Sequence, residues 1–307
     1  ADFSGSVVAN IPLRSYGDKT FYAKWTPISY NITYNLNGGT NDDANKLSYN
    51  IQTPTFTLLD PERVGYTFSG WFDNGDFNGD EITEIVVGSV GNREYWAKWT
   101  PTVYDITYNL NGGNNHDDNP ADYTIETTTF ILRDGNRAGY TFSGWFDNAE
   151  FNGTAVTQIV VGSTGNREYW AKWTPITYDI TYNLNGGNNH TGNVATYTIL
   201  TPTFTIKDGD RVGYTFSGWF DNAEFNGTAV TQITVNSTGN KEYWAKWIPT
   251  VYNITYNLNE GNNHTSNPAD YTIETTTFIL EDGNRVGYTF SGWFNNADFS
   301  GSEVTDI

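Results

Sequence analysis

The sequence contains no cysteine, so neither a disulfide bond nor a thiolate metal site can stabilise the fold. It also contains no methionine, as we expect of a piece of a longer protein. No apolar run approaches the roughly 20 residues of a membrane-spanning helix, and no secretory h-region is visible. Basic residues are scarce: 16 Lys and Arg against 35 Asp and Glu give a formal net charge of −19. This charge argues against nucleic-acid binding, because phosphates would be repelled.

What the chain does have is a repeated octapeptide, Gly-Tyr-Thr-Phe-Ser-Gly-Trp-Phe. Its copies lie at Gly65–Phe72, Gly139–Phe146, Gly213–Phe220 and Gly287–Phe294. Each copy begins 74 residues after the previous one, so the chain is a tandem array. β-Favouring residues alternate within each copy, which predicts a strand with aromatic side chains on both faces. Gly65 precedes the strand as a turn residue, and Gly70 marks a bulge or a close approach of the backbone.

Large aromatic side chains are expected to form the core of so small a repeat. Aromatic residues make up 16% of the chain, and a unit of this size lies near the lower limit for independent folding. The predicted core tryptophans are Trp71, Trp145, Trp219 and Trp293 in the octapeptides, and Trp99, Trp173 and Trp247 in Ala-Lys-Trp elements. An exposed aromatic platform for a ligand is the alternative role for the same side chains.

The repeat period predicts the domain boundaries. Whole repeats are expected at 26–99, 100–173 and 174–247, with the C-terminal part of a truncated repeat at 1–25 and the N-terminal part of another at 248–307. Only Thr174 and Pro175 separate Trp173 from the next predicted strand near Thr177. Because proline restricts its own backbone and that of the preceding residue, the linker should be stiff. We therefore expect an extended rod of repeats.

The second repeat illustrates the predicted secondary structure. Alternating residues predict strands at 104–110, 139–146 and 168–173, and a less regular strand region spans 123–132. The segment 156–161 is apolar at spacings that fit either a short helical turn or a strand. No helix longer than two turns is expected, so the fold class should be mostly β.

Three ordered motifs resemble a known family. They are Ile106–Gly113 (Ile-Thr-Tyr-Asn-Leu-Asn-Gly-Gly), Gly139–Trp145 (Gly-Tyr-Thr-Phe-Ser-Gly-Trp) and Ala171–Trp173 (Ala-Lys-Trp). The pattern resembles the Listeria–Bacteroides repeat, the internalin B-type B repeat of large bacterial surface proteins. The resemblance implies a β-grasp-like unit in an exported, cell-envelope-attached protein, with no catalytic residues to carry over. The chain departs from the family in having Ala138 or Val before the octapeptide glycine, where the family often has proline.

Several side chains could suggest chemistry, but no catalytic, cofactor or metal site is expected. His116, His190 and His264 share one position of the repeat, but Asp42 replaces them in the first repeat, and neither Cys nor a second His accompanies them. The acidic loop Asp73–Glu81 could bind calcium, yet its equivalents Asp147–Thr154 and Asp221–Thr228 carry fewer acids and lack a calcium-loop spacing. Asx-type turns without metal are the preferred interpretation.

The Ala-Lys-Trp lysines, Lys98, Lys172 and Lys246, leave two interpretations open. Each could cover an aromatic face with its aliphatic stem, or it could form an isopeptide bond with an asparagine. The first requires fewer assumptions.

The sequence as a whole predicts a non-enzymatic array on the outside of a bacterial-type cell. The expected function is a rigid stalk or fibre-forming spacer, and the alternative is a multivalent adhesin that binds a glycan or a protein. The expected partners are neighbouring repeats or further copies of the chain. Head-to-tail polymerisation, with Phe21–Trp25 of one chain completing the Tyr252–Ile307 repeat of another, competes with a simple fragment boundary as the explanation of the chain ends.

Overall fold

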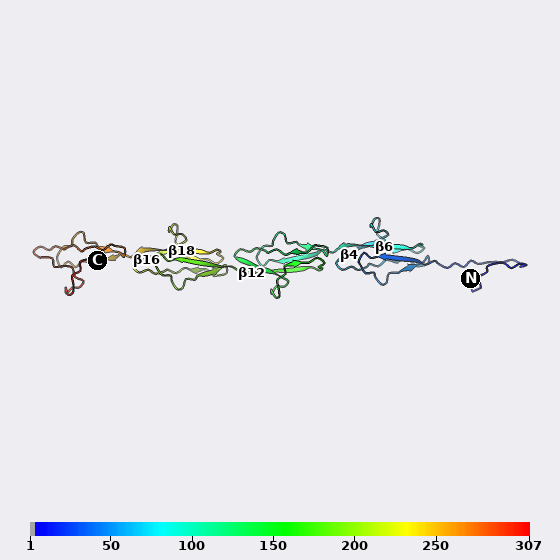
Figure 1. The fold of residues 1–307 in the computed structure, drawn as a ribbon, viewed down its shortest axis with the longest axis horizontal. Helices are drawn as coiled ribbons and strands as arrows, with labels where there is room; N and C mark the ends of the chain where they lie inside the picture. The colour runs from blue at the N-terminus through cyan, green and yellow to red at the C-terminus, as the bar shows by residue number, and fades with distance from the viewer. Residues whose placement is uncertain (1–3) are drawn as a thin grey trace. The chain divides into compact units, whose positions relative to one another are not determined.

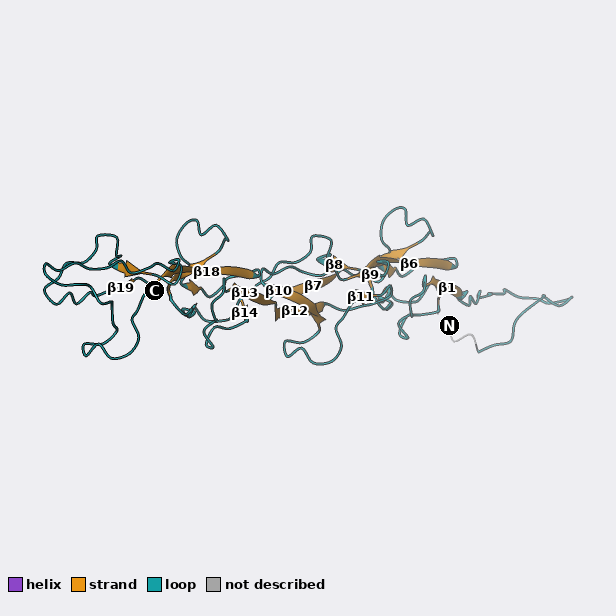
Figure 2. Cartoon of the chain, turned by 60° about the vertical axis from the view of Figure 1, so that its left-hand side comes forward, coloured by secondary structure: helices purple, strands orange, loops and turns teal. Residues whose placement is uncertain are grey.

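The computed structural model describes residues 4–307 (Figure 1). Residues 1–3, which belong to the expected truncated repeat 1–25, lie outside this range. The described chain divides into two compact units, one formed by 4–110, 115–134 and 144–171, and the other by 111–114, 135–143 and 172–307. Strands and loops build both units, and no helix occurs among residues 4–307 (Figure 2). The chain is thus a mostly β tandem repeat, as its sequence predicts.

The first repeat, within the first unit, contains a four-stranded mixed sheet and a two-stranded ribbon. Its strands are β1 (Tyr30–Asn35), β2 (Ser48–Tyr49), β3 (Phe56–Thr57), β4 (Tyr66–Phe72), β5 (Glu84–Ile85) and β6 (Arg93–Pro101). The sheet has the order β2-β1-β6-β4, and β3 pairs with β5 to form the ribbon. β1 and β6 pair in parallel at the centre, while β2 and β4 pair antiparallel with them at the edges.

The second and third repeats use the same arrangement. The second contains β7 (Tyr104–Asn109), β8 (Asp122–Tyr123), β9 (Phe130–Ile131), β10 (Tyr140–Phe146), β11 (Gln158–Ile159) and β12 (Arg167–Pro175). The third contains β13 (Thr177–Asn183), β14 (Thr196–Thr198), β15 (Phe204–Thr205), β16 (Tyr214–Phe220), β17 (Gln232–Ile233) and β18 (Lys241–Pro249). Their sheets have the orders β10-β12-β7-β8 and β14-β13-β18-β16, with ribbons β9–β11 and β15–β17.

The core of the first repeat is aromatic and aliphatic. Its buried members are Ile32, Tyr49, Leu58, Trp71, Ile85, Tyr95 and Ala97. Trp71 is 1% exposed and lies with its ring centroid 5.0 Å from that of Tyr34 and 5.4 Å from that of Phe68. Alternation explains this arrangement, because every second residue of β1 and β6 turns its side chain to the same face of the sheet.

A bulge allows β4 to direct both Phe68 and Trp71 into the core. The register between β4 and β6 shifts between these residues, where β4 contains one residue more than β6. Gly70 lies at the bulge with a φ of +111°, a conformation that side-chain-bearing residues rarely adopt. The sequence predicts either a bulge or a close approach of the backbone at this glycine, and the structure shows the bulge.

The segment between consecutive repeats differs from the predicted linker. β6 continues through Thr100 and Pro101, which pair with Thr67 and Tyr66 of β4. The residues after the tryptophan therefore extend the sheet of the preceding repeat. Pro101 is tolerated here because it is the last residue of the strand, where its nitrogen does not have to donate a hydrogen bond to a neighbouring strand.

The fourth octapeptide does not form the predicted strand. In that repeat the paired strands are β19 (Tyr252–Asn253) and β20 (Asp270–Tyr271), and the octapeptide at 287–294 forms only an isolated bridge between Trp293 and Val304. The physical reason is the missing partner, because in the other repeats this strand pairs with the Tyr-Trp-Ala-Lys-Trp strand. The same reason explains why Phe21–Trp25, which corresponds in the repeat to the Tyr-Trp-Ala-Lys-Trp strand, is also unpaired.

The ambiguous segment 156–161 contains the short strand Gln158–Ile159 rather than a helical turn, and Val161 lies in the turn that follows. β11 pairs antiparallel with β9 through Gln158 and Ile159 (Figure 2). Val156 forms an additional antiparallel bridge with Trp145, and its N–H donates to the Trp145 carbonyl at 2.7 Å. Backbone pairing on both sides of the segment thus decides between two conformations that the apolar spacing alone left open.

Candidate functional site

The predicted core tryptophans fall into groups with different burial. Trp71, Trp145 and Trp219 are each 1% exposed, whereas Trp99, Trp173, Trp247 and Trp293 are half-buried. The indole N–H of Trp71 donates to the Leu59 carbonyl at 3.1 Å, and that of Trp99 donates to the Leu36 carbonyl at 2.9 Å. Both kinds of ring are therefore held by a backbone acceptor as well as by packing.

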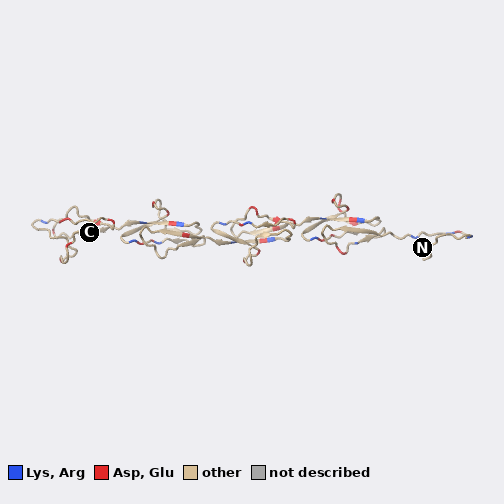
Figure 3. Cartoon of the chain, viewed as in Figure 1, with Lys and Arg blue, Asp and Glu red and all other residues tan. Residues whose placement is uncertain are grey.

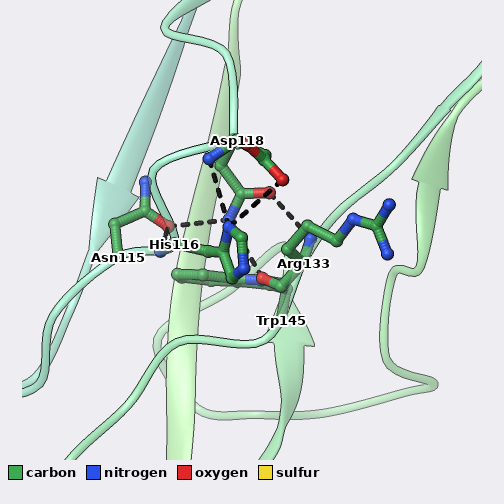
Figure 4. Close-up of polar contacts among 6 residues, drawn as sticks. Asn115, His116, Asp118, Arg133 and Trp145 are labelled. Atoms are coloured by element: carbon green, nitrogen blue, oxygen red, sulfur yellow. Dashed lines mark hydrogen bonds and ion pairs between the residues drawn. The ribbon is translucent and has the colours of Figure 1, made fainter.

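An asparagine that the sequence reasoning missed fixes the loop above each buried tryptophan. In the second repeat, Asn119 Nδ2 donates to the Arg133 carbonyl at 2.9 Å, and the Arg133 N–H donates back to Asn119 Oδ1 at 2.7 Å. Trp145 Nε1 donates to the same carbonyl at 2.9 Å (Figure 4). Asn45, Asn193 and Asn267 occupy the equivalent positions. Their recurrence at the repeat period was the signal available in the sequence.

The loop histidines take part in local turns. His116 Nδ1 accepts a hydrogen bond from the Asp118 N–H at 3.1 Å, and the His116 N–H donates to Asn115 Oδ1 at 2.9 Å (Figure 4). His190 and His264 likewise accept from Gly192 and Ser266. Within residues 4–307, no three His, Cys, Asp or Glu side chains gather in a way that could hold a metal ion.

The acidic loop after β4 is organised by an asparagine. Asn74 Nδ2 donates to the Asn78 carbonyl at 2.8 Å, and the Asn78 N–H donates to Asn74 Oδ1 at 3.0 Å. Phe77 has a φ of +56° and packs edge-on against Phe72 with a centroid distance of 5.8 Å. Lys98 Nζ lies 5.1 Å from the centroid of Phe72, in agreement with a lysine that covers an aromatic face.

Consecutive repeats meet at the glycine that begins the octapeptide. A methyl group on Gly65 would lie 2.5 Å from Cδ1 of Ile125, a residue of the next repeat. Gly65 also has a φ of +79°, and its carbonyl accepts a hydrogen bond from the Thr102 N–H at 3.0 Å. Glycine is needed here for two reasons: the backbone conformation disfavours any side chain, and the isoleucine occupies the space that a side chain would fill.

The same contact recurs at later junctions. Ile199 covers Gly139 and Ile273 covers Gly213, and the two glycine carbonyls accept hydrogen bonds from Ile176 and Thr250. A tyrosine–glutamate hydrogen bond accompanies the contact at the first and third junctions, where Tyr66 donates to Glu126 at 2.8 Å and Tyr214 to Glu274 at 2.9 Å. Leu200 replaces the glutamate at the second junction.

Arginine stacking supports the tyrosine at each of these positions. The guanidinium carbon of Arg63 lies 3.6 Å from the ring centroid of Tyr66, and that of Arg211 lies 3.7 Å from the ring of Tyr214. Such stacking favours a fixed ring orientation. The hydrogen bond to Glu126 raises the pKa of Tyr66 above its ordinary value, because ionisation would break that bond.

A groove lies between the ribbon and the start of the last strand in the first two repeats. The first groove has a volume of about 410 Å³ and the second of about 430 Å³. Their linings correspond residue for residue at the 74-residue period, from Asp73 to Trp96 in the first repeat and from Asp147 to Trp170 in the second. Buried Ile85 and Tyr95 contribute to the first lining, and the exposed residues Glu84 and Glu94 stand on its two strands.

Half-buried tyrosines make the repeats sensitive to alkaline pH. Burial raises the pKa of Tyr34 from 10.0 to about 12, with a smaller contribution from Tyr95. The folded state therefore favours the protonated phenol. The contribution of Tyr34 to the free energy of unfolding is complete below about pH 10 and is lost as the pH rises towards 12.

We expect the melting temperature to fall between about pH 10 and pH 12. Tyr34→Phe should weaken the dependence, whereas Tyr16→Phe, at a fully accessible ring, should leave it unchanged. Equal titration curves for the parent and Tyr34→Phe would contradict this prediction.

Comparison with known proteins gives a family match along most of the chain. The family model of the Listeria-Bacteroides repeat domain matches residues 30–90, 104–172, 178–246 and 252–307. Each of the four matched segments contains one copy of the octapeptide. The family is a structural repeat type rather than an enzyme family.

Two curated relatives come from Evansella cellulosilytica. One, provisionally named a membrane protein, is 28% identical over 92% of this chain and 42% of its own length. The other, provisionally named a Gly-rich membrane protein, is 25% identical over 95% of this chain and 33% of its own length. The chain thus spans less than half of either relative. In the described part of the chain, no helix is long and apolar enough to cross a membrane.

Proposed function

Since the chain belongs to the Listeria-Bacteroides repeat family of bacterial surface proteins, we propose that it is a stalk or spacer segment on the outside of the cell. In this role each repeat would support the next one, and the array would set the distance between the parts of the protein that it separates. The observation that supports this role most strongly is the recurrent contact between the octapeptide glycine and the isoleucine of the next repeat.

Three features of the junction favour stiffness. β6 extends past Trp99, and its last residues still pair with β4. The segment that joins one repeat to the next is therefore partly held in the sheet and is not a free linker. The glycine carbonyl accepts a hydrogen bond from the connection itself, as in Thr102 to Gly65. Finally, Ile125 fills the space above Gly65 and restricts rotation between the repeats.

The net charge of −19 is compatible with this role. Asp and Glu occur along the strands and loops of the repeats rather than in one of them alone (Figure 3). Repulsion between like charges keeps molecules apart in solution and opposes self-association. A spacer exposed to solvent along its length benefits from such a surface, and neighbouring repeats of the same chain are among its proposed partners.

Small-angle X-ray scattering tests the spacer directly. A compact globule of 74 residues has a radius of gyration of about 11 Å, so an array of four repeats joined end to end should exceed about 100 Å in its longest dimension. A near-spherical particle would rule out the spacer role, whatever the chain binds.

The junction predicts a specific loss of stiffness. Ile125→Ala removes the side chain over Gly65, so we expect a broader distance distribution between the first two repeats. Because the chain lacks cysteine, single cysteines replacing Asp76 and Glu150 can carry a pair of spin labels without background. The matched control is Ile131→Ala, which removes an exposed isoleucine of the same repeat. Equal distributions in both variants would show that the isoleucine contact does not set the junction.

A multivalent binding module is the alternative function. It is favoured by one observation: the same groove occurs at the same place in the first and second repeats. A binding role and a spacer role are compatible, because the grooves involve none of the junction residues.

A further inference from the structure

The geometry points to the groove of the first two repeats as a binding site for an extended, basic peptide segment, which would be added as a strand between β5 and β6 or between β11 and β12. This inference is independent of the spacer role. It follows from the direction of backbone groups on both sides of the groove, from the charge of the lining and from its apolar floor.

The β6 side of the groove is an open strand edge. In a strand, the backbone N–H and C=O groups of successive residues point to alternate sides. The Thr102 N–H donates to the Gly65 carbonyl, so the backbone groups of Thr102 point towards β4. By alternation, the N–H and C=O groups of every second residue before it, including Trp96 and Glu94, point to that same side of β6. The bulge does not disturb this alternation, because the additional residue is on β4. β4 ends at Phe72, opposite Trp96. No strand of the described chain therefore pairs with Glu94 on that side.

The β5 side of the groove is open as well. The Leu58 N–H donates to the Thr83 carbonyl at 2.8 Å, and the Val87 N–H donates to Thr55 Oγ1 at 3.0 Å. Residues 83, 85 and 87 thus direct their backbone groups towards β3, so Glu84 and Val86 direct theirs away from it. The groove is lined by both of these residues and by Glu94. The Val86 carbonyl accepts a turn hydrogen bond from the Ser89 N–H at 3.2 Å, so the open backbone position on this side is Glu84, and on the other side it is Glu94. These two positions lie on opposite sides of one cavity, and an extended peptide can pair with unpaired strand edges.

The second repeat reproduces this arrangement. Its Leu132 N–H donates to the Thr157 carbonyl at 2.8 Å, and its Val161 N–H donates to Thr129 Oγ1 at 3.0 Å. The open backbone positions are therefore Gln158 and Glu168, which both line the second groove. Two equivalent sites on one chain would strengthen the binding of a partner that carries the segment more than once.

The lining favours a basic ligand. Asp73, Glu84 and Glu94 line the first groove, and the single basic residue among its lining side chains, Arg93, directs its Nε towards the Tyr49 hydroxyl at 3.2 Å. The floor includes buried Ile85 and Tyr95. Alternate side chains of an added strand point to opposite faces, so apolar residues can face the floor while lysines between them face the acids and solvent.

A natural difference between the two grooves provides an internal control. Glu84 in the first repeat corresponds to Gln158 in the second, so the second groove carries one negative charge less. The first groove should bind a basic peptide more tightly than the second. Glu84→Gln should make the first groove behave like the second, and Gln158→Glu should have the opposite effect. Both positions are exposed, so neither variant should change the melting temperature.

The test uses the full chain and the synthetic peptide acetyl-Val-Lys-Val-Lys-Val-amide. Hydrogen exchange followed by NMR should show that the amides of Glu84 and Glu94 exchange rapidly in the free protein and at least tenfold more slowly with saturating peptide. The amides of Ile85 and Tyr95, whose backbones face β3 and β1, are the internal reference and should not change. Titration should give at least threefold weaker binding at the first groove in Glu84→Gln.

Two further peptides decide between strand addition and simple charge attraction. N-methylation of the valines in one peptide, or of the lysines in the other, preserves the charge but removes backbone donors on one edge. Each should bind at least tenfold more weakly than the parent peptide. Equal binding of the methylated peptides, or no binding of the parent peptide at millimolar concentration, would overturn the proposal. Protection of the Glu84 and Glu94 amides by a neutral oligosaccharide such as cellopentaose, but not by the peptide, would replace it with a glycan site.

Discussion

Replacement of Trp71 by alanine should unfold the first repeat at a cost of about 3–5 kcal/mol, the usual range for a tryptophan removed from a core. Trp71 is 1% exposed, contacts Tyr34 and Phe68, and donates its indole N–H to the Leu59 carbonyl. The loss combines a large cavity with a lost hydrogen bond. Because each repeat has its own aromatic core, the third repeat should remain folded.

Hydrogen exchange resolved by repeat is the appropriate measurement. In Trp71→Ala, the amides of β1, β4 and β6 should lose protection, while those of β13, β16 and β18 should retain it. Trp25→Ala is the matched control, because Trp25 is 88% exposed and makes no contribution to a core. If the amides of the first repeat are as well protected in Trp71→Ala as in the parent protein, the ring does not support the fold. A ligand-binding role for the ring then becomes the better explanation.

Gly39→Ala should destabilise the first repeat by about 1–3 kcal/mol through overpacking. A methyl group on Gly39 would lie 2.5 Å from Cζ2 of Trp99 and 3.0 Å from the Glu62 carbonyl oxygen. The ring cannot move away without cost, because its Nε1 donates to the Leu36 carbonyl at 2.9 Å. The backbone on the other side is fixed by the bridge between Thr40 and Glu62.

Chemical denaturation of four proteins measures this effect. The parent, Gly39→Ala, Trp99→Phe and the double variant form a cycle in which the smaller phenylalanine ring leaves room for the methyl group. Gly39→Ala should therefore cost less in the Trp99→Phe background than in the parent. Strictly additive costs would mean that the clash with Trp99 is not the source of the destabilisation.

Much of the repeat could be predicted from the sequence because its signals are local. The alternation in Tyr104–Asn109 and in the octapeptide identifies strands directly, and the period identifies the array. The bulge at Gly70 was also accessible, because a glycine inside an alternating aromatic strand has few other roles. Pairing partners were less accessible. The fourth octapeptide has the same sequence as the others and yet is not a strand, since a strand is a property of two segments and its partner is missing.

The junction illustrates the second limit of sequence reasoning. Ile125 recurs as Ile51, Ile199 and Ile273, but its partner is a glycine of the preceding repeat. Within one period, an isoleucine in a Thr-rich segment suggests only a strand. Similarly, Asn45 and its equivalents belong to polar loops whose composition predicts turns, and only the structure shows that their amides hold the segment that accepts the tryptophan hydrogen bond.

The parallel pairing of β1 with β6 also determines the order in which a repeat can fold. Ile32 pairs with Arg93, and Tyr34 with Tyr95, so the central pair of the sheet joins the beginning and the end of the repeat. During synthesis, neither β1 nor β4 has its principal partner until β6 has emerged. Long-range pairing of this kind is slow, because a large loop must close before the contacts form. A growing array should therefore acquire structure in discrete steps, one repeat at a time, each triggered by the arrival of its final strand.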